Sequence, residues 1–246
     1  MKTGFLLTVA YDGTNYSGWQ RQKNAYTVQQ AMEETLSKVF NQPIVVTGAS
    51  RTDAGVHALG QRVCFSAENI SVPLNKIPLV LNNCLPEDIA VFNAEIVPLD
   101  FNPRYRAREK TYQYRIDNDT FPNPFLRKTT WYYPFILDVD AMKTAAAYFM
   151  GEHDFAAFRS TGTDYNSTVR ELFECSVTQE KKTITITVRG NAFLYNMARI
   201  IAGTLVYVGR LKIKPADITC IIASKDRTRA GITAPPHGLT LVEIKY

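Results

Sequence analysis

The chain has 246 residues, of which 46% are hydrophobic and 21% are charged. These ordinary globular proportions exclude a mainly disordered chain, and the length suits one large domain or two modest ones. Lys and Arg outnumber Asp and Glu by 28 to 23, and the net charge of +5 is compatible with a nucleic-acid partner without implying one.

Membrane, secretion and metal signals are weak throughout the sequence. The N-terminal apolar run ends at Asp12, too early for a signal peptide, and no stretch approaches the roughly 20 apolar residues that cross a bilayer. The four cysteines are scattered and form no C-x-x-C pair, which indicates a reducing compartment, so we expect a cytoplasmic protein with no membrane partner. The three histidines are far apart in sequence, so we expect no metal site.

The first half of the chain alternates predicted strands and helices. Thr27 followed by Gln30 is a capping-box pattern that predicts a helix start, and an apolar stripe at helical spacing follows it. A second helix is predicted over residues 74–83. The predicted strands cover residues 5–11, 44–47, 61–67 and 89–97. The order β-α-β-β-α-β is typical of a ferredoxin-like fold.

The second half again combines strands with helices. Asp138 can cap a helix that runs to Met150, and further helices are predicted over residues 193–208 and 215–223. The predicted strands cover residues 110–116, 131–135, 171–178, 183–189 and 239–245. We therefore predict an α+β protein of two ferredoxin-like halves, residues 1–104 and 105–246, with mostly antiparallel sheets. A cleft between two such halves is a common place for a ligand, and we expect the active site there.

The glycine-bearing loop at residues 48–60 is the first candidate for chemistry. Arg51 and Asp53 are two residues apart, so on an extended segment their side chains would face the same way. One interpretation is a ligand-binding loop, and the other is an ordinary turn with a solvated ion pair worth about 0–1 kcal/mol. Composition alone favours the ordinary turn.

Two further segments combine charged and apolar side chains. Basic residues interleave with tyrosines over residues 104–115, a pattern that suits either RNA phosphates and bases or a strand with a tyrosine core face and solvated charges. Arg199 stands alone on a largely apolar helix, so it must reach water or pair with an anion. Residues 234–239 form a rigid turn before the last strand.

Taken together, the motifs resemble the tRNA pseudouridine synthase A family, also called tRNA-uridine isomerase I. The resemblance follows the chain in order, through residues 11–22, 51–58, 110–114, 193–199 and 234–239, and it spans nearly the whole length. The segment at residues 51–58, which reads RTDAGVHA, is the most specific match. Ala198 stands where valine is common in the family, a packing change that affects no assigned role.

The resemblance implies the pseudouridine synthase fold and isomerisation of uridine to pseudouridine at positions 38, 39 and 40 of the tRNA anticodon stem-loop. It also implies a homodimer that binds tRNA and uses no cofactor and no metal. The target base is expected to be flipped out of its stack. Asp53 is then the catalytic nucleophile, and Arg199 pairs with it. Tyr112 stacks on the uracil and manages its proton. Arg51 is expected among the catalytic residues and also binds substrate, by helping to hold the flipped nucleotide or the gap that it leaves. His57 and Leu239 are expected to bind substrate, with Leu239 in the wall of the site.

The alternative from another class is a non-catalytic RNA-binding or RNA-folding protein on the same scaffold. The basic charge favours an RNA partner in both cases, because it is concentrated in two segments. Residues 104–128 contain seven Lys or Arg against three Asp or Glu, and residues 199–231 contain seven against two. A small-molecule enzyme with a mildly basic pocket is a weaker third alternative.

Overall fold

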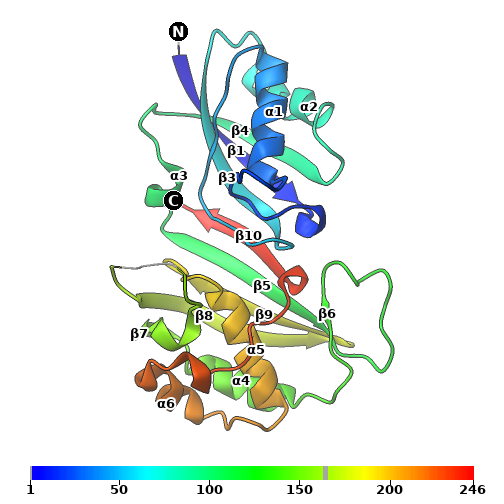
Figure 1. The fold of residues 1–246 in the computed structure, drawn as a ribbon, viewed down its shortest axis with the longest axis vertical. Helices are drawn as coiled ribbons and strands as arrows, with labels where there is room; N and C mark the ends of the chain where they lie inside the picture. Colours follow the sequence, from blue (N-terminus) through cyan, green and yellow to red (C-terminus); the bar gives the residue numbers. More distant parts are fainter. Residues whose placement is uncertain (1, 163–165) are drawn as a thin grey trace. The chain divides into compact units, whose positions relative to one another are not determined.

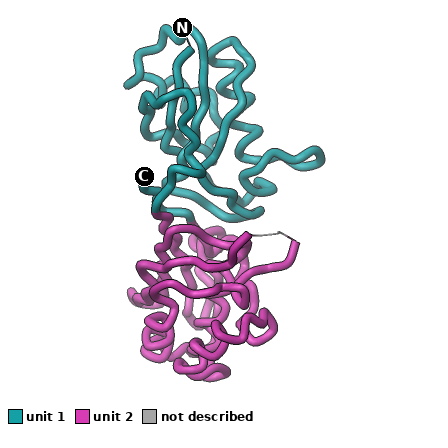
Figure 2. The backbone as a smooth tube through the Cα atoms, turned by 90° about the vertical axis from the view of Figure 1, so that its left-hand side faces the viewer, with its two compact units in different colours: residues 1–108, 241–246 teal, residues 109–240 magenta. Residues whose placement is uncertain are grey.

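The computed structural model describes residues 2–162 and 166–246 and divides the chain into two compact units. Unit 1 consists of residues 1–108 and 241–246, and unit 2 consists of residues 109–240 (Figure 2). Both units mix helices with sheets whose strand pairs are mostly antiparallel, so the predicted α+β class is confirmed. Within the described residues, no helix is long and apolar enough to span a membrane.

Unit 1 is built on a sheet whose strands follow the order β4-β1-β3-β10. Its main elements are β1 (Lys2–Tyr11), α1 (Val28–Phe40), β2 (Thr47–Gly48), β3 (His57–Glu68), α2 (Ile77–Asn82), β4 (Ile89–Val97), α3 (Pro103–Arg106) and most of β10 (Leu239–Lys245), whose first two residues belong to unit 2. β1 runs antiparallel to both β3 and β4, and the short β2 pairs with β3. Figure 1 shows α1 and α2 on the same side of this sheet. The β-α-β-β-α-β order predicted for the first half is therefore present.

Unit 2 has a sheet of order β5-β9-β8-β7, and β6 runs parallel to β5 at one end. Its main elements are β5 (Glu109–Asp117), β6 (Trp131–Tyr132), α4 (Val139–Ala147), β7 (Gly151–Asp154), β8 (Val169–Glu180), β9 (Thr183–Gly190), α5 (Met197–Gly209) and α6 (Asp217–Ser224). α4 contacts β8 and α5, and α5 contacts β5. The apolar face of α5 is fully buried at Ile200 and Ile201, so this helix forms the centre of the core of unit 2.

The boundary between the units differs from the predicted division at residue 104. Unit 1 extends to Arg108 and also includes the end of the chain, whereas residues 239–245 were predicted as part of the second half. The backbone N–H of Arg108 donates to the carbonyl of Lys245 at 2.8 Å, and the rings of Phe101 and Tyr246 lie edge to face with centroids 5.2 Å apart. These contacts join the C-terminal residues to unit 1.

The predicted strand at residues 44–47 is wrong over most of its length, because only Thr47 and Gly48 pair in the sheet. The backbone N–H of Ile44 donates to Ser37 Oγ at 3.0 Å, and that of Val46 donates to Glu33 Oε1 at 3.2 Å. Side chains of α1 thus satisfy donors that a strand would have given to its neighbour.

The predicted helix at residues 193–208 begins four residues later, at Met197. Asn196 has φ of 61° and ψ of 6°, a left-handed conformation that cannot continue into a helix. The predicted helix from Asp138 starts as expected, since the Asp138 side chain accepts a hydrogen bond from the N–H of Ala141, but it ends at Ala147. The strand β7 lies just beyond it and was not predicted.

Candidate active site

In unit 1, the loop that carries Asp53 is held by backbone hydrogen bonds from the N-terminal segment. The N–H of Trp19 donates to the carbonyl of Thr52 at 3.0 Å, and the N–H of Gly55 donates to the carbonyl of Tyr16 at 3.4 Å. The loop also closes on itself, because the N–H of Val56 donates to the carbonyl of Asp53 at 3.1 Å. Asp53 therefore sits on a short turn that is attached to residues 16–19.

The attachment requires a glycine at position 18. Gly18 has φ of +85°, a backbone conformation that side chains with a Cβ rarely adopt. A Cβ there would also lie 2.6 Å from the carbonyl oxygen of Thr52. The two segments approach so closely that only glycine fits between them.

The residue between Arg51 and Asp53 points into the protein. Thr52 is buried, and its hydroxyl lies 2.7 Å from the hydroxyl of Tyr11. Arg51 is exposed and Asp53 is half-buried. Thr52 is therefore more buried than either charged neighbour, and the shared direction of Arg51 and Asp53 stays a prediction.

His57 follows the loop and is almost completely buried, with 5% of its surface exposed. The backbone N–H of Gly13 donates to His57 Nδ1 at 3.0 Å, so this ring nitrogen accepts a hydrogen bond. The carboxylate of Asp12 also lies 3.1 Å from Nδ1, but a nitrogen that accepts from Gly13 cannot donate to Asp12. The Gly13 contact joins the end of the loop to the segment after β1.

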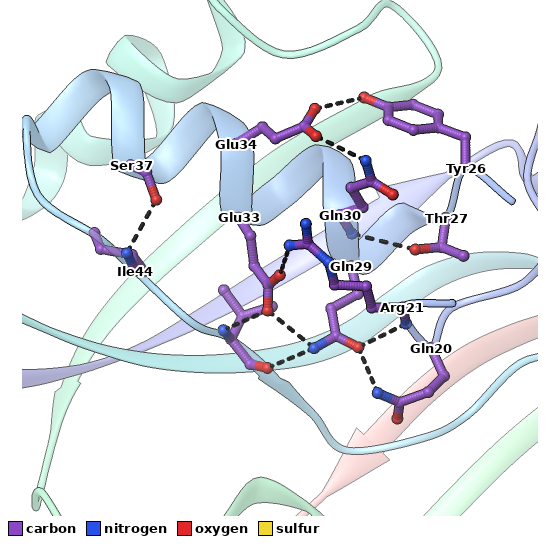
Figure 3. A network of polar contacts seen from close by, with 11 residues as sticks. Gln20, Arg21, Tyr26, Thr27, Gln29, Gln30, Glu33, Glu34, Ser37 and Ile44 are labelled. Carbon is purple, nitrogen blue, oxygen red and sulfur yellow. Dashed lines mark hydrogen bonds and ion pairs between the residues drawn. The ribbon is translucent and has the colours of Figure 1, made fainter. Parts of the chain in front are cut away.

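A network of polar side chains on α1 also contacts two segments of unit 1, residues 20–21 and Val46 (Figure 3). Gln29 and Glu33 are both buried, at 7% and 5% exposure. Gln29 Nε2 donates to Glu33 Oε1 at 3.0 Å and to the carbonyl of Val46 at 3.1 Å. Gln29 Oε1 accepts hydrogen bonds from the side chain of Gln20 at 2.7 Å and from the N–H of Arg21 at 3.0 Å. Sequence reasoning missed these two residues, and their only sequence signal is a polar pair four residues apart beside the apolar stripe.

In unit 2, Tyr112 and Tyr114 are both buried and share one face of β5, as the strand pattern predicts. The ring of Tyr112 packs edge to face on Phe193, with centroids 4.9 Å apart. The hydroxyl of Tyr114 donates to the carbonyl of Pro235 at 2.8 Å. Burial raises the pKa of Tyr114 well above its usual range and the positive charge of Arg199 opposes this, so the phenol stays protonated at neutral pH.

Arg199 lies in the first turn of α5 and is half-buried. Its Nε donates to the carbonyl of Ala234 at 2.8 Å, and its Nη1 donates to Asn196 Oδ1 at 2.7 Å. The N–H of Ala234 donates back to the carbonyl of Arg199 at 3.2 Å. These contacts fix the orientation of the guanidinium group.

The turn at residues 234–238 therefore connects two candidate elements within unit 2. It accepts a hydrogen bond from Tyr114 of β5 and another from Arg199 of α5, and it leads directly into Leu239, which is buried. The turn contains a short 3₁₀ helix over Pro236–Gly238.

The six predicted site residues are divided evenly between the units. Arg51, Asp53 and His57 belong to unit 1, and Tyr112, Arg199 and Leu239 belong to unit 2. Among the residues that the structure describes, no group of three or more His, Cys, Asp and Glu side chains could hold a metal ion.

Comparisons with known proteins agree on one family. A family model described as tRNA pseudouridine synthase matches residues 7–106 and 145–246. Curated proteins named tRNA pseudouridine synthase A are 48% identical in Caldicellulosiruptor saccharolyticus, 49% in Ruminiclostridium cellulolyticum and 46% in Geotalea uraniireducens. Each of these matches covers 98% of this chain and 98% of the relative.

Proposed function

Because this chain belongs to the tRNA pseudouridine synthase family and isomerises uridine in tRNA, we propose that its targets are positions 38, 39 and 40 of the anticodon stem-loop and that Asp53 is its nucleophile. The observation that carries this proposal is the loop at residues 51–58, which lies inside the matched region and is held in unit 1 by residues 16–19. The half-buried carboxylate of Asp53 stands on that loop.

The reaction requires a group that acts at the sugar carbon C1′. The N1–C1′ bond of uridine breaks, the uracil turns, and a C5–C1′ bond forms, while the C5 proton leaves and N1 gains a proton. C1′ develops positive charge as the glycosidic bond breaks, much as in glycoside hydrolysis. The Asp53 carboxylate attacks C1′ as the uracil leaves with the bonding electrons, and it is released when C5 bonds to C1′. No external reactant is consumed.

Tyr112 and Arg199 take the two supporting roles in this proposal. Tyr112 stacks on the uracil and assists removal of its C5 proton, and its ring is already held by Phe193. Arg199 supplies the positive charge that keeps the Asp53 carboxylate ionised. Its guanidinium group is suited to this role because Ala234 and Asn196 fix its orientation.

The remaining site residues bind the nucleotide. Arg51 is exposed and contacts the flipped nucleotide, and Leu239 is buried and provides an apolar wall. The predicted substrate contact of His57 stays a prediction, and its burial and its bond from Gly13 favour support of the loop. Flipping the base out of its stack costs a few kcal/mol, which basic contacts to the flanking phosphates offset.

The assembly and the compartment are part of the same proposal. We infer that the protein works as a homodimer, as the family resemblance implies, and that it acts in the cytoplasm, where its tRNA substrate is processed. Size-exclusion chromatography with light scattering measures the oligomeric state, and a fluorescent fusion shows the compartment in which the protein is found.

The experiment that tests this function follows tritium release from tRNA labelled at C5 of uridine. Three substrates that each keep a uridine at only one of positions 38, 39 and 40 separate the proposed targets. Asp53→Asn keeps the size of the side chain but removes its charge, and we expect it to lower the rate by about 10³–10⁴-fold. Asp100→Asn, at an exposed aspartate of the same unit, serves as the matched control and should keep full activity. Full activity of Asp53→Asn would overturn the nucleophile, and release from other positions only would overturn the target sites.

A further inference from the structure

We propose that Arg21 binds a phosphate of the tRNA backbone beside the Asp53 loop, and that Glu33 of α1 orients Arg21 for this contact. The proposal deepens the proposed function and rests on it, because the ligand is the phosphodiester backbone of the tRNA substrate. Arg21 belongs to the motif at residues 11–22, and none of the roles assigned above uses its side chain.

Arg21 is fixed at both its main chain and its side chain by residues of α1 (Figure 3). Its backbone N–H donates to Gln29 Oε1 at 3.0 Å. Its Nη1 donates to Glu33 Oε2 at 2.6 Å, a short charge-assisted contact. The guanidinium group of Arg21 is therefore oriented before any ligand arrives.

The partner carboxylate is itself held rigidly. Glu33 Oε1 accepts hydrogen bonds from Gln29 Nε2 at 3.0 Å and from the N–H of Val46 at 3.2 Å. The side chain of Glu33 is only 7% exposed, so its carboxylate has little contact with water. A buried ion pair is weak evidence for stability, since apolar side chains often serve as well in its place. The arrangement is better explained by the precise position that it gives to Arg21.

The outer side of the Arg21 guanidinium group is open to a ligand. The Arg21 side chain is 52% exposed, although its partner is buried. The residues that the structure describes supply no hydrogen-bond partner for Nε or Nη2, so these two groups can donate to a ligand. A planar guanidinium with two such donors matches the oxygens of a phosphate group.

The position of Arg21 in the chain places this group near the reactive loop. Trp19, two residues earlier, donates its N–H to the carbonyl of Thr52 at 3.0 Å, and Thr52 directly precedes Asp53. Residues 20–24 are all exposed and polar, and they contain Arg21 and Lys23 but no acidic residue. An RNA strand that brings a uridine to Asp53 would meet this basic segment within the same unit.

The experiment measures the affinity of the purified full-length protein for unmodified tRNA over a range of salt concentrations. Each phosphate contact contributes about 0.7–0.9 to the slope of log K against log salt. We expect Arg21→Gln to weaken binding about 5–20-fold near 0.1 M salt and to reduce the slope by about that amount, with a similar loss on every tRNA. Lys38→Gln removes the same charge from an exposed position at the other end of α1 and should leave the slope unchanged.

Two further variants separate phosphate binding from a structural role. Arg21→Lys keeps the charge but loses the planar group, so we expect it to retain the slope and recover part of the affinity. Glu33→Gln should weaken binding when Arg21 is present and change nothing when it is combined with Arg21→Gln, because Glu33 acts through Arg21. If thermal unfolding shows that Arg21→Gln is too unstable to measure, Arg21→Lys still tests the proposal, because an unchanged affinity in that variant would contradict the need for the planar group.

Three results would overturn the proposal: an unchanged slope in Arg21→Gln, an equal loss of slope in Lys38→Gln, or a Glu33→Gln effect that persists without Arg21. The assay reads binding, whereas the nucleophile and the target positions are read by tritium release. Failure of Asp53→Asn to stop turnover would therefore leave the salt dependence of Arg21 intact, and the two ideas fail separately.

Discussion

The two units hold their candidate residues by different means. In unit 1, the Asp53 loop is attached through backbone groups, such as the bond from the Trp19 N–H to the Thr52 carbonyl, and through the close approach of Gly18. In unit 2, side chains do the attaching, because Tyr114 and Arg199 both donate to carbonyls of the turn at residues 234–235. At these contacts the turn of Asp53 depends on the shape of the main chain, although side chains of Thr52 and His57 also help to hold the loop. The turn at residues 234–235 depends mainly on two polar side chains.

This contrast predicts which substitutions harm each unit. A backbone contact tolerates many side chains but not an added atom at the point of closest approach. A side-chain contact tolerates small movements but not the loss of a donor that satisfies a buried carbonyl. Three experiments test the contrast, beginning with the largest expected effect.

Gly18→Ala should damage unit 1 severely. The new Cβ would lie 2.6 Å from the Thr52 carbonyl oxygen, and the backbone would remain at φ of +85°. We expect a loss of roughly 2–5 kcal/mol in the free energy of unfolding, the sum of strain and overpacking, measured by urea denaturation. Tritium release should fall as well, because Asp53 follows Thr52.

Gly151→Ala is the matched control for this prediction. Gly151 has a similar φ of +94°, but its nearest neighbour to a new Cβ is the ring of His153 at 3.9 Å. We expect only the conformational cost of about 1–2 kcal/mol. Equal losses at the two positions would mean that close approach contributes nothing at Gly18, and the comparison of the units would fail.

Tyr114→Phe should have the next largest effect, and it acts on unit 2. It removes the donor to the Pro235 carbonyl and leaves that oxygen without its partner, at a cost of about 1–2 kcal/mol in the free energy of unfolding. Tyr112→Phe, on the same face of β5, should lower turnover more than tRNA affinity, since the ring still stacks while the hydroxyl is lost. If Tyr112→Phe destabilises the protein and Tyr114→Phe does not, the contrast between the two units is contradicted.

Asp154→Asn tests how the contact between the side chains of Asp154 and Lys225 in unit 2 depends on pH. Lys225 Nζ lies 2.7 Å from Asp154 Oδ2, and hydrogen bonds from Lys225 and then Thr168 hold the pKa of Asp154 below its usual value. A lowered folded pKa stabilises the protein above the unfolded value, near pH 4, and this contribution is lost as the pH falls through the folded value.

We therefore expect Asp154→Asn to reduce the free energy of unfolding more at pH 7 than at pH 3. The difference should stay below about 1 kcal/mol, because Lys225 is largely exposed. Urea denaturation at both pH values measures it. A larger loss at pH 3 would reverse the sign and contradict the lowered pKa. The backbone bonds that hold the Asp53 loop have no such titration.

Local signals predicted much of the fold, because they depend on neighbours in the sequence. The Thr27 side chain accepts from the N–H of Gln30, and the Asp138 side chain accepts from the N–H of Ala141, as the capping patterns indicate. The strand at residues 89–97 is confirmed over its full length. Each of these features is decided within a few residues.

The wrong predictions of secondary structure arise where residues distant in the sequence form hydrogen bonds with the segment. The segment at residues 44–47 reads as a strand, but Glu33 and Ser37 capture its backbone donors from another element. The candidate site follows the same rule. The motif around Asp53 is legible in the sequence, but its attachment to Trp19 and Gly13 joins positions more than thirty residues apart, and no local pattern reports it.

The return of residues 241–246 to unit 1 has a consequence for synthesis of the protein. Residues 109–240 separate the two parts of unit 1, so its sheet lacks β10 until residues 239–245 have been made. At about 5–20 residues per second, that interval lasts roughly 7–26 seconds. During this time β10 is not available to pair with the edge of β3. The strands of the unit 2 sheet end with β9 at Gly190, so they can pair before β10 has been made.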